Sequence, residues 1–489
     1  MKTTNTITTK INNQRFEIGG EKAFMPLGNF LRNEESLTGT KIVCAEGDCG
    51  ACTVLIAKEV GVDGKLSFKS VNSCILPLYL IDGAQVITVE GIAKSEGMNF
   101  DLHEVQKKMV DCNGAQCGYC TPGFICAMAG AVEKFKSEGK EITEKSAKNY
   151  LTGNLCRCTG YQPIIEALTT VDMGKAELLK DRYNDAEWIN EMKSINERSV
   201  EMQFSDKSIY LPTDLSVALT IKAQDPDVRL IAGSTDIGVV VNKGKLETKK
   251  TMALYHIDEL KNISHDESYI SVGATVTLTE FENYIETHFK EMSRMLHIFA
   301  SPQIKNQATL VGNVVNASPI ADTIPFLMVS DAIVELQSKK GTRSVLMKDF
   351  YIGYKKLNMD SSEIVTKIKI PVLVKNEKTK LYKVSMRKDL DISAVTFAAR
   401  IILDGKKMTT VKIALGGVAA TVVRLTDIES QLNGQDFSEA LFKQTSESLG
   451  QYIKPLSDLR ASSDYRMLVS KNYFVKFAKE ISLELGGGQ

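Results

Sequence analysis

The sequence predicts a multidomain α+β protein, and three observations lead to that prediction. At 489 residues the chain is long enough for about three or four domains, each with its own core. Short apolar runs typical of strands are interleaved with longer stretches of helical periodicity. All ten cysteines, from Cys44 to Cys158, lie in the first third of the chain. A cysteine-rich N-terminal region is therefore expected to precede domains of different chemistry.

The composition excludes several classes of protein. The 60 Lys and Arg residues balance 60 Asp and Glu residues, so nothing indicates a nucleic-acid or anionic-membrane partner. No stretch of about 18 or more apolar residues predicts a transmembrane helix. The N-terminus, MKTTNTITTK, lacks the apolar segment of a signal peptide. We therefore expect a soluble cytoplasmic protein, in which clustered thiols bind metal or do redox chemistry rather than form disulfides.

The first group of cysteines occupies the motif CAEGDCGACTVLI and one distant position: Cys44, Cys49, Cys52 and Cys74. The C-x4-C-x2-C…C spacing is typical of plant-type ferredoxins, which bind a [2Fe–2S] cluster. Gly47 and Gly50 allow a tight loop whose backbone N–H groups point at sulfur. Predicted strands at TVLI and IDGAQVITVEGI and a short helix at PLGNFLRNE indicate a β-grasp domain. Structural cysteines or a zinc site are the less favoured alternative, because zinc sites prefer C-x2-C pairs on both sides.

The second group combines a C-x2-C pair with a C-x-C pair: Cys117, Cys120, Cys156 and Cys158. Spacing alone leaves zinc open beside an iron–sulfur cluster. FICAMAGAVEKFKSEG and EKSAKNYLTGNLCRCTGYQPIIEALTTV have apolar residues at helical intervals, and Pro122 stands where a helix can begin. The pairs are therefore expected at helix ends in a four-helix arrangement, where helix N-termini stabilise thiolate charge.

Taken together, these motifs resemble a known family. QCGYCTPG and GNLCRCTGY, downstream of CAEGDCGACTV, closely resemble the two iron–sulfur domains of the xanthine dehydrogenase family of molybdenum hydroxylases. The resemblance implies that the second group of cysteines holds a second [2Fe–2S] cluster. Cys112 and Cys126 have no ligand counterparts in the family, and we interpret both as small apolar packing residues.

The chain changes character after the cysteine-rich region. Residues 175–200, KAELLKDRYNDAEWINEMKSINERSV, are charged and show little apolar periodicity, so they are expected to be a linker. YLPTDLSVALTIKAQDPDVRLIAGSTDIGVVV then predicts a helix, an apolar strand, a small-residue turn and another apolar run. Glycine in such a turn lets backbone amides approach a phosphate, but these residues alone favour a plain strand–turn–strand. The sequence has neither a Rossmann nor a P-loop motif.

The resemblance extends to a flavin domain, because LIAGSTDIG, ATLVGNVVNASPIAD and YKVSMRKDLDISAV match the family in order. It implies a loop around the FAD pyrophosphate, formed by Leu230, Ile231, Ala232, Gly233, Ser234, Thr235, Asp236 and Ile237. It also implies that Phe299 lies beside the isoalloxazine and that Lys383 contacts the flavin. The phosphates and the adenosine side would be bordered by Thr309, Gly312, Asn313 and Asp322. Phe299 would cover one ring face, with a core phenylalanine as the alternative. Leu390 departs from the acidic residues that the family often has after the lysine, which leaves open how the flavin meets NAD and oxygen.

The C-terminal part predicts an α+β module, with strands at FAARIIL and VKIALGGVAATVVRL and an amphipathic helix at SSDYRMLVSKNYFVKFAKEI. The resemblance continues through ALGGVA and RASSDYRMLV. It implies four domains and a linker: a β-grasp [2Fe–2S] ferredoxin domain, 1–87; a four-helix [2Fe–2S] domain, 88–174; the linker, 175–200; a two-part α+β FAD-binding domain of the PCMH/vanillyl-alcohol-oxidase type, 201–377; and a C-terminal α+β domain like that of the CO dehydrogenase flavoprotein, 378–489.

The resemblance also implies a function. The sequence ends at LELGGGQ without a molybdopterin domain, and we identify no catalytic residue. We expect an electron-transfer chain similar to the iron–sulfur/FAD small subunit of bacterial two-subunit xanthine dehydrogenases. Its cofactors would be two [2Fe–2S] clusters and FAD, with NAD as co-substrate. Molybdopterin would lie only on a large partner subunit, in a heterotetramer of two small and two large chains.

Several points stay open at this level. Xanthine or hypoxanthine is the expected substrate, but another N-heterocycle or an aldehyde is an alternative. A stand-alone NADH-dependent iron–sulfur flavoprotein reductase would share the flavin without a large partner, and an iron–sulfur scaffold would lack flavin. For the subunit interpretation, Gly118, Tyr119, Thr121 and Arg157 are expected to form the docking surface around the second cluster.

Overall fold

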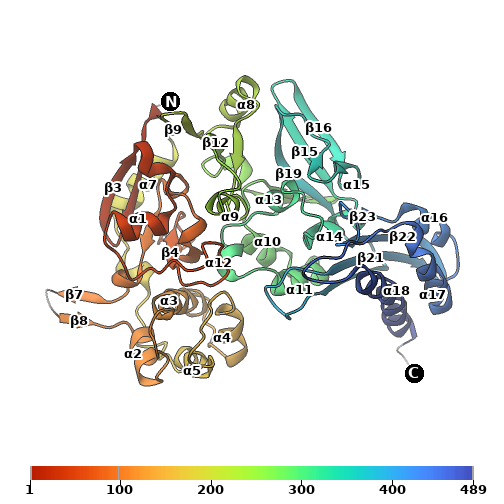
Figure 1. The fold of residues 1–489 in the computed structure, drawn as a ribbon, viewed down its shortest axis with the longest axis horizontal. Helices are drawn as coiled ribbons and strands as arrows, with labels where there is room; N and C mark the ends of the chain where they lie inside the picture. The colour runs from red at the N-terminus through yellow and green to blue at the C-terminus, as the bar shows by residue number, and fades with distance from the viewer. Residues whose placement is uncertain (1–2, 97–98, 487–489) are drawn as a thin grey trace. The chain divides into compact units, whose positions relative to one another are not determined.

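The computed structural model describes residues 3–96 and 99–486 (Figure 1). The terminal residues of the predicted ferredoxin and C-terminal domains, 1–2 and 487–489, lie outside the described residues. The chain divides into two compact units. Unit 1 comprises Met1–Ile221, Asp227–Asp258 and Ser301–Ala308, and unit 2 comprises Lys222–Pro226, Glu259–Ala300 and Thr309–Gln489. No helix among the described residues is both long and apolar enough to cross a membrane.

The N-terminal part of unit 1 is a five-stranded mixed sheet with one helix packed on it. The strand order is β3-β2-β6-β4-β5, and β2 and β6 are the parallel pair. The elements are β2 (Thr6–Ile11), β3 (Gln14–Gly19), α1 (Leu27–Asn33), β4 (Thr53–Ala57), β5 (Lys69–Asn72) and β6 (Gln85–Ile87). Leu27 and Leu31 of α1 are fully buried with Ile7 and Val86 of the sheet. This architecture confirms the predicted β-grasp domain, with the first cysteine motif in the loop between α1 and β4.

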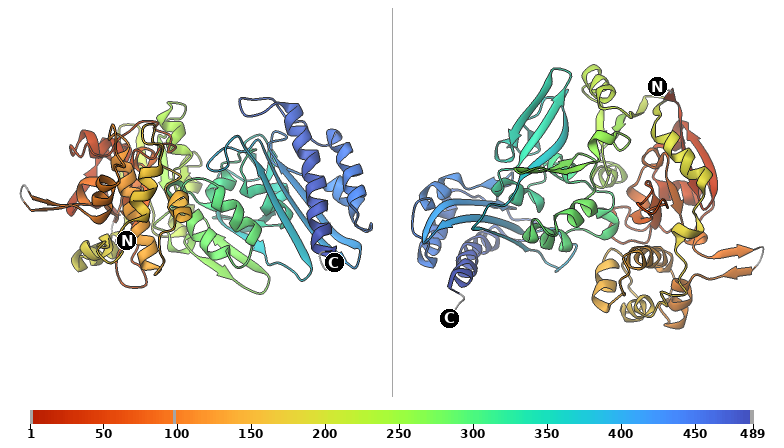
Figure 2. Two further views of the ribbon diagram at one scale, coloured as in Figure 1. Left: turned by 90° about the horizontal axis from the view of Figure 1, so that it is seen from below. Right: turned by 180° about the vertical axis from the view of Figure 1, so that it is seen from behind.

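Four helices form the second cysteine-rich domain, as Figures 1 and 2 show. They are α2 (Glu104–Asp111), α3 (Thr121–Ser137), α4 (Glu144–Tyr150) and α5 (Gln162–Thr169), and a hairpin of β7 (Lys94–Glu96) and β8 (Asn99–Asp101) precedes them. Residues Gly123–Glu133 of α3 are all buried, because the helix is rich in alanine and runs through the domain core. Cys126 lies in that core and is 1% exposed, while Cys112 is half-buried beside it. The four-helix prediction is confirmed.

Residues 175–200 are not an irregular linker. They contain α6 (Leu179–Arg182) and α7 (Ala186–Asn196) and the start of β9 (Ser199–Phe204). Trp188 and Met192 of α7 are 2% and 1% exposed and pack into the core of the helical domain. The expectation of little apolar periodicity was therefore wrong: Trp188, Ile189, Met192 and Ile195 follow helical spacing that the intervening charges hide. Lys10 and Asp185 join α7's first turn to β2 by a 2.5 Å ion pair.

Glu133 ties this segment to α3, and its ionisation is expected to make stability depend on pH. The Glu133 carboxylate is 6% exposed and accepts the backbone N–H of Leu179 at the start of α6. Burial raises the pKa of Glu133 to about 7 from an ordinary 4.5. A raised folded-state pKa gives stability that is complete below about pH 4.5 and is lost as the pH rises to about 7, a change of about 3 kcal/mol.

Replacing Glu133 with glutamine removes this ionisation and keeps an oxygen for the backbone. We expect the melting temperature of E133Q to gain on that of the wild type between about pH 5.5 and about pH 8. Thermal unfolding followed by circular dichroism checks this. Parallel melting curves of the two proteins across that range would show that Glu133 does not titrate there.

A second sheet in unit 1 carries the first flavin-like motif. Its order is β1-β9-β10-β12-β11, from β1 (Thr3–Thr4), β9, β10 (Lys207–Leu211), β11 (Arg229–Ile231) and β12 (Lys250–Ala253), with α8 (Leu215–Gln224) between β10 and β11. After β11 the chain turns and enters a helix, α9 (Ile237–Asn242). The favoured strand–turn–strand is therefore wrong. The three consecutive valines of α9 favour a strand by local propensity, but packing against the rest of unit 1 determines the conformation.

Unit 2 contains two larger sheets. The first has the order β13-β14-β19-β15-β16, from β13 (Ile263–His265), β14 (Tyr269–Gly273), β15 (Ile333–Ser338), β16 (Gly341–Leu346) and β19 (Ile364–Pro371), beside a small β17 (Tyr351–Gly353) and β18 (Lys356–Leu357) pair. Its helices are α10 (Leu278–Ile285), α11 (Lys290–Ile298), α13 (Leu310–Val315), α14 (Thr323–Val329) and α15 (Met347–Phe350). These elements form the second part of the predicted FAD-binding domain.

The C-terminal sheet confirms the predicted α+β module. Its strands are β20 (Glu377–Val384), β21 (Val395–Asp404), β22 (Lys407–Gly416) and β23 (Val423–Arg424), in sequence order. The helices α16 (Thr426–Leu432), α17 (Glu439–Glu447) and α18 (Ser463–Gly486) follow, and α18 runs along the sheet (Figure 2). Phe397 of β21, Phe442 of α17 and Phe474 and Phe477 of α18 are fully buried together. Their aromatic packing stabilises the domain.

Candidate cofactor sites

The four thiols of the first motif converge in unit 1. Cys52 and Cys74 are 1% and 2% exposed, while Cys44 and Cys49 are half-buried at the loop surface. Hydrogen bonds from Cys49 and Cys74 lower the pKa of Cys44, and donating those bonds raises the pKa of both donor thiols. Cys74 also donates to Cys52, which lowers the pKa of Cys52. The four thiols therefore lie close enough together to bind one cofactor.

The backbone of this loop is shaped around the sulfurs. Gly47 and Gly50 have φ of 79° and 67°, in the left-handed region that glycine adopts without strain. The backbone N–H of Glu46 points at Cys44 Sγ, 3.4 Å away, and that of Gly47 at the Cys74 sulfur. A Cβ on Gly50 would lie 2.3 Å from the Gly153 carbonyl oxygen, so a side chain there would collide. The loop thus fits a [2Fe–2S] cluster, with N–H groups available to its sulfurs.

The second motif places its thiols at the ends of helices. Cys120 is the N-cap residue of α3, and Cys156 and Cys158 lie in the loop before α5. Cys117 and Cys158 are exposed, and their sulfurs are 3.5 Å apart. Burial and a hydrogen bond to Cys156 raise the pKa of Cys120 to about 12. The Thr159 hydroxyl donates to Cys156 Sγ at 3.2 Å.

The pairing of the sulfurs distinguishes the two metal interpretations. In the second motif Cys117 pairs with Cys158 and Cys120 with Cys156. A [2Fe–2S] cluster needs two pairs of thiolates, one for each iron, whereas zinc needs four ligands around one ion. The two pairs of the second motif therefore fit the two irons of such a cluster.

The two cluster loops touch through their backbones within unit 1. The Leu155 N–H, one residue before Cys156, donates to the Cys49 carbonyl oxygen at 3.0 Å. The Asn154 amide donates to the Gly50 carbonyl oxygen at 2.9 Å, and Gln303 donates to Asn154 Oδ1 at 2.7 Å. Asn154 and Gln303 are 2% and 0% exposed. The bond from Leu155 thus joins the segment before Cys156, a predicted ligand of the second cluster, to Cys49, a predicted ligand of the first.

The predicted flavin loop 230–237 ends β11, makes a tight turn and begins α9. Ser234 has a φ of 61° and is 7% exposed. A Cβ on Gly233 would lie only 1.8 Å from the Gln307 carbonyl oxygen, so the turn passes directly against residues 307–308. Only glycine fits this approach, which is the property expected of a backbone cradle for phosphate.

The short helix α9 connects this turn to the first cysteine motif. A Cβ on Gly238 would lie 2.4 Å from the Ile75 carbonyl oxygen, which shows how closely the helix packs. Asn242, at the last turn, donates to the carbonyl oxygens of Cys74 at 2.8 Å and Ala45 at 2.9 Å. Helix α9, which follows the flavin-like turn, therefore packs directly against the segment that carries Cys74.

The remaining predicted flavin residues lie in unit 2. Thr309 caps α13, since its hydroxyl accepts the Gly312 N–H at 2.9 Å, and Asn313 accepts the Thr323 hydroxyl at 2.6 Å. The structure brings Thr309, Gly312 and Asn313 together in one turn of α13. Their contacts with FAD stay predictions, as do those of the loop in unit 1.

Asp322, Lys383 and Phe299 come together in unit 2. Lys383 Nζ donates to Asp322 Oδ2 at 2.6 Å, and both side chains are almost fully buried. The hydroxyls of Ser393 and Thr396 donate to Asp322 Oδ1. Lys383 Nζ also lies 6.0 Å from the Phe299 ring centroid, within cation–π range. Lys383 is thus held by an aspartate and directed beside the aromatic residue predicted to face the flavin.

Three family profiles match the chain in order. They are described as a [2Fe-2S] binding domain over residues 88–169, an FAD binding domain in molybdopterin dehydrogenase over 171–373, and a CO dehydrogenase flavoprotein C-terminal domain over 380–481. Xanthine dehydrogenase 1 of Arabidopsis thaliana is 28% identical over 96% of this chain, and xanthine dehydrogenase of Emericella nidulans is 30% identical over 87%. The chain belongs to the xanthine dehydrogenase family of molybdenum hydroxylases.

Membership of this family confirms the predicted fold class and the presence of iron–sulfur and FAD-binding domains. The chain spans 39% of the length of the Arabidopsis relative and 35% of the Emericella relative. Among solved structures, carbon monoxide dehydrogenase from Hydrogenophaga pseudoflava matches 55% of this chain and 94% of its own, with a TM-score of 0.53 and 20% identity. Quinoline 2-oxidoreductase from Pseudomonas putida 86 matches 57% and 98%, with a TM-score of 0.52 and 24% identity. These structures share the fold of the part of the chain that they match.

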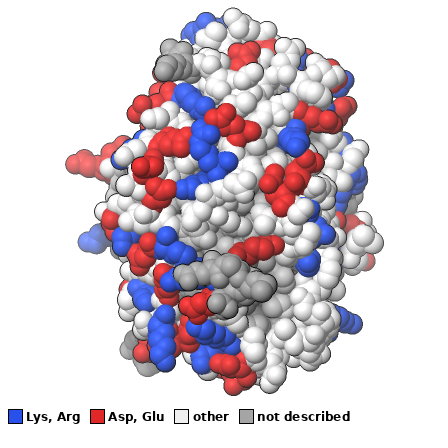
Figure 3. Space-filling model, turned by 90° about the vertical axis from the view of Figure 1, so that its left-hand side faces the viewer, with Lys and Arg blue, Asp and Glu red and all other residues white. Residues whose placement is uncertain are grey.

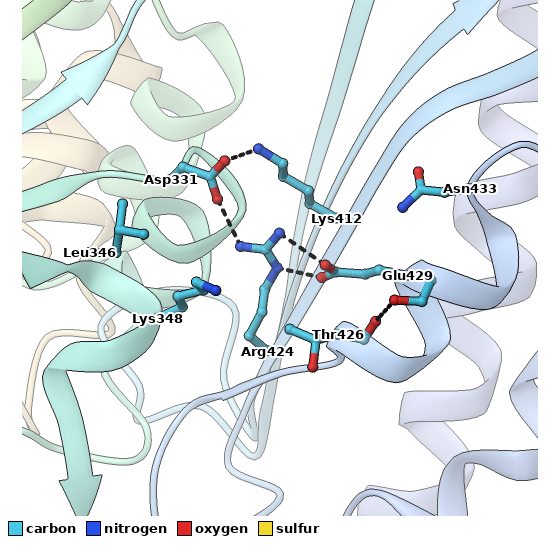
Figure 4. A pocket seen from close by; sticks show the side chains of 9 residues that line it. Asp331, Leu346, Lys348, Lys412, Arg424, Thr426, Glu429 and Asn433 are labelled. Atoms are coloured by element: carbon cyan, nitrogen blue, oxygen red, sulfur yellow. Dashed lines mark hydrogen bonds and ion pairs between the residues drawn. The ribbon is translucent and has the colours of Figure 1, made fainter.

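A pocket of about 400 Å³ in unit 2 belongs to a structural ion-pair network (Figure 4). It is lined by Asp331, Leu346, Lys348, Lys412, Arg424, Thr426, Glu429, Ser430 and Asn433. Arg424 forms a two-point pair with Glu429, and both side chains are 8% exposed. Arg424 also donates to the Met328 carbonyl oxygen at 2.6 Å and to Asp331 at 3.0 Å. These bonds tie the end of α14 to β23 and α16, so Asp331, Arg424 and Glu429 of the lining are already paired with one another.

Sequence reasoning missed the residues that connect the sites. Asn154, Asn242 and Gln303 link the motifs; Asn154 lies in the GNLCRCTGY motif without a predicted role, and the other two lie outside the quoted motifs. Their partners are far away in sequence, since Asn154 lies 104 residues from Gly50 and Gln303 lies 149 residues from Asn154.

Proposed function

We propose that this chain is the electron-transfer subunit of a molybdenum hydroxylase. It would pass electrons from a separate molybdopterin-containing subunit through two [2Fe–2S] clusters to FAD and on to NAD. The observation that carries the proposal is the continuous series of contacts in unit 1: Leu155 to Cys49 between the two motifs, and Asn242 to Cys74 toward the flavin-like turn. The two cysteine motifs and the flavin-like turn at residues 230–237 are therefore packed together within unit 1.

The burial of the thiols supports an order of transfer. Cys117 and Cys158 of the helical domain are exposed, whereas Cys52 and Cys74 are buried. An exposed cluster can receive electrons from a docked partner, and a buried one suits internal transfer. We propose that electrons enter at the helical-domain cluster, continue to the ferredoxin-type cluster and then reach FAD. Bound FAD supplies the exchange between the single electrons of the clusters and the hydride that NAD accepts.

The proposed substrate is xanthine or hypoxanthine, because the relatives that match most of this chain are named xanthine dehydrogenases. The proposed assembly is a heterotetramer of two small and two large chains in the cytoplasm, acting in purine catabolism. Charges of both signs are mixed on the face drawn in Figure 3, with no broad region of one sign. That mixture is consistent with a protein partner for this face rather than a polyanion.

Rapid mixing with xanthine under anaerobic conditions tests the proposal. We expect the flavin absorbance of the small chain to bleach when the molybdopterin subunit is present, and to stay unchanged when the small chain is alone. NADH should reduce the flavin in both samples. Bleaching of the isolated chain by xanthine would contradict the subunit assignment. If an aldehyde or another N-heterocycle reduces the complex and xanthine does not, only the substrate assignment is wrong.

A further inference from the structure

The side chain of Gln307 is unusual because it is buried while its amide has no hydrogen-bond partner among the described residues. It is 7% exposed, and neither its amide nitrogen nor its amide oxygen has a hydrogen-bond partner among the described residues. Burial of an unpaired amide is costly, so native proteins nearly always provide a partner for it. A buried glutamine with both ends of its amide free therefore indicates a ligand or an ordered water.

The neighbouring polar residues of the segment 301–308 use their side chains differently. The Ser301 hydroxyl accepts the Ile304 N–H, Gln303 donates to Asn154, and Asn306 donates to the Ser70 carbonyl oxygen. These bonds fix the segment onto the cluster loops of unit 1. In the described segment 301–308, Gln307 is the residue whose amide has neither its donor nor its acceptor paired.

The backbone position of Gln307 identifies what is nearby. Its carbonyl oxygen lies against Gly233, where a Cβ would come within 1.8 Å, and the backbone N of Ala308 would be 3.0 Å from the same Cβ. The backbone of Gln307 therefore forms one wall of the turn predicted to cradle the FAD pyrophosphate, and its side chain starts from that wall. A carboxamide offers an N–H donor for a phosphate oxygen and an acceptor for a ribityl or ribose hydroxyl.

We infer that Gln307 binds FAD directly, with its amide N–H₂ donating to the pyrophosphate or its amide oxygen accepting from a neighbouring hydroxyl. This inference rests on the proposed function, since it requires FAD at the turn. It adds a cofactor ligand that neither the flavin-like motifs nor the family profiles identify. The chemistry fits because one side chain meets the alternating charged and hydroxyl groups of the dinucleotide chain.

The test measures FAD affinity of the full chain, titrating FAD into deflavinated protein by fluorescence quenching. Gln307→Leu should weaken binding by about tenfold or more, the effect of removing a hydrogen bond to a charged group. Gln307→Glu, nearly the same shape, distinguishes the two contacts: it should weaken binding further if the amide donates to the pyrophosphate, because its carboxylate would face phosphate, and should bind nearly as the wild type does if the amide oxygen accepts from a hydroxyl. Both variants should keep the visible circular dichroism of the two clusters.

Gln85 provides a matched control. It is 0% exposed and also has both amide atoms unpaired, but it lies in β6 within the β-grasp sheet. Gln85→Leu should leave the dissociation constant for FAD unchanged. If Gln307→Leu also binds FAD as the wild type does, the inference is wrong and a buried water serves the amide.

A second measurement needs no substitution. Hydrogen exchange of the peptide containing residues 301–308 in the wild type should slow when FAD is added. If Gln307→Leu and Gln307→Glu fail to fold, absence of this protection alone overturns the inference. A wild type that binds no FAD would refute the proposed function itself, which separates the two failures.

Discussion

Replacing Cys117 or Cys156 with serine is expected to remove one [2Fe–2S] cluster and leave the other in place. The thiols of the second motif pair only with one another, Cys117 with Cys158 and Cys120 with Cys156, and those of the first motif lie in a different loop. Iron and acid-labile sulfide should fall from about four to about two per chain. Electron paramagnetic resonance of the reduced protein should lose one of two distinct signals. The loss should be complete, because a serine oxygen is a poor substitute for thiolate at such a cluster.

Two controls sharpen this experiment. Cys126 is 1% exposed in the helical core, and Cys112 is half-buried with its sulfur 3.7 Å from the Thr170 hydroxyl. Cys112→Ser and Cys126→Ala should keep about four irons per chain. Finding zinc at either motif would contradict the cluster assignment. If Cys156→Ser removes both signals, the second motif also stabilises the first cluster, through the hydrogen bond from Leu155 to the Cys49 carbonyl oxygen.

The sequence predicted what depends on local spacing. The cysteine motifs, the β-grasp domain, the four helices and the C-terminal strands all follow from patterns within a few residues. The contacts that join the motifs depend on residues brought together by folding. Gln303, for example, lies 250 residues from Thr53, which its amide approaches at 3.4 Å. No local pattern carries such information.

The two errors in secondary structure have a common physical cause. Trp188 and its apolar neighbours in α7 are separated by charged residues, and α9 contains three valines. In both segments local propensity opposes or hides the structure, and packing against another element decides it. For α9 that element is the backbone at Ile75, which lies close to Gly238. The predicted flavin residues of unit 2 show the same limit, since the buried pair of Asp322 and Lys383 joins positions 61 residues apart.

The surface around the second cluster is expected to be the docking site of the molybdopterin subunit. Tyr119 is 50% exposed and Arg157 is exposed, beside the exposed thiols of Cys117 and Cys158. Lys41 Nζ lies 5.9 Å from the Tyr119 ring centroid, which holds the ring in place over this loop. Tyrosine and arginine are frequent anchors of protein interfaces, and an electron-receiving cluster must face its donor.

Changing Tyr119 and Arg157 together to glutamate should therefore abolish coupling to the partner. Two carboxylates buried at an interface without partners cost several kcal/mol, so xanthine-to-NAD turnover should fall by about 100-fold or more. NADH oxidation with an artificial dye should remain unchanged, because it uses only the flavin of this chain. Size-exclusion chromatography should show loss of the complex.

The matched control is Tyr354→Glu with Arg460→Glu, which makes the same change in charge elsewhere. Tyr354 is 61% exposed and the Arg460 side chain 38% exposed, both in unit 2. This control should keep the complex, its turnover and its dye activity. If the Tyr119 and Arg157 variant also keeps complex formation and turnover, the partner docks on another face. The exposed cluster would then need a different donor, because electrons cannot enter efficiently through a surface that the molybdopterin subunit does not cover.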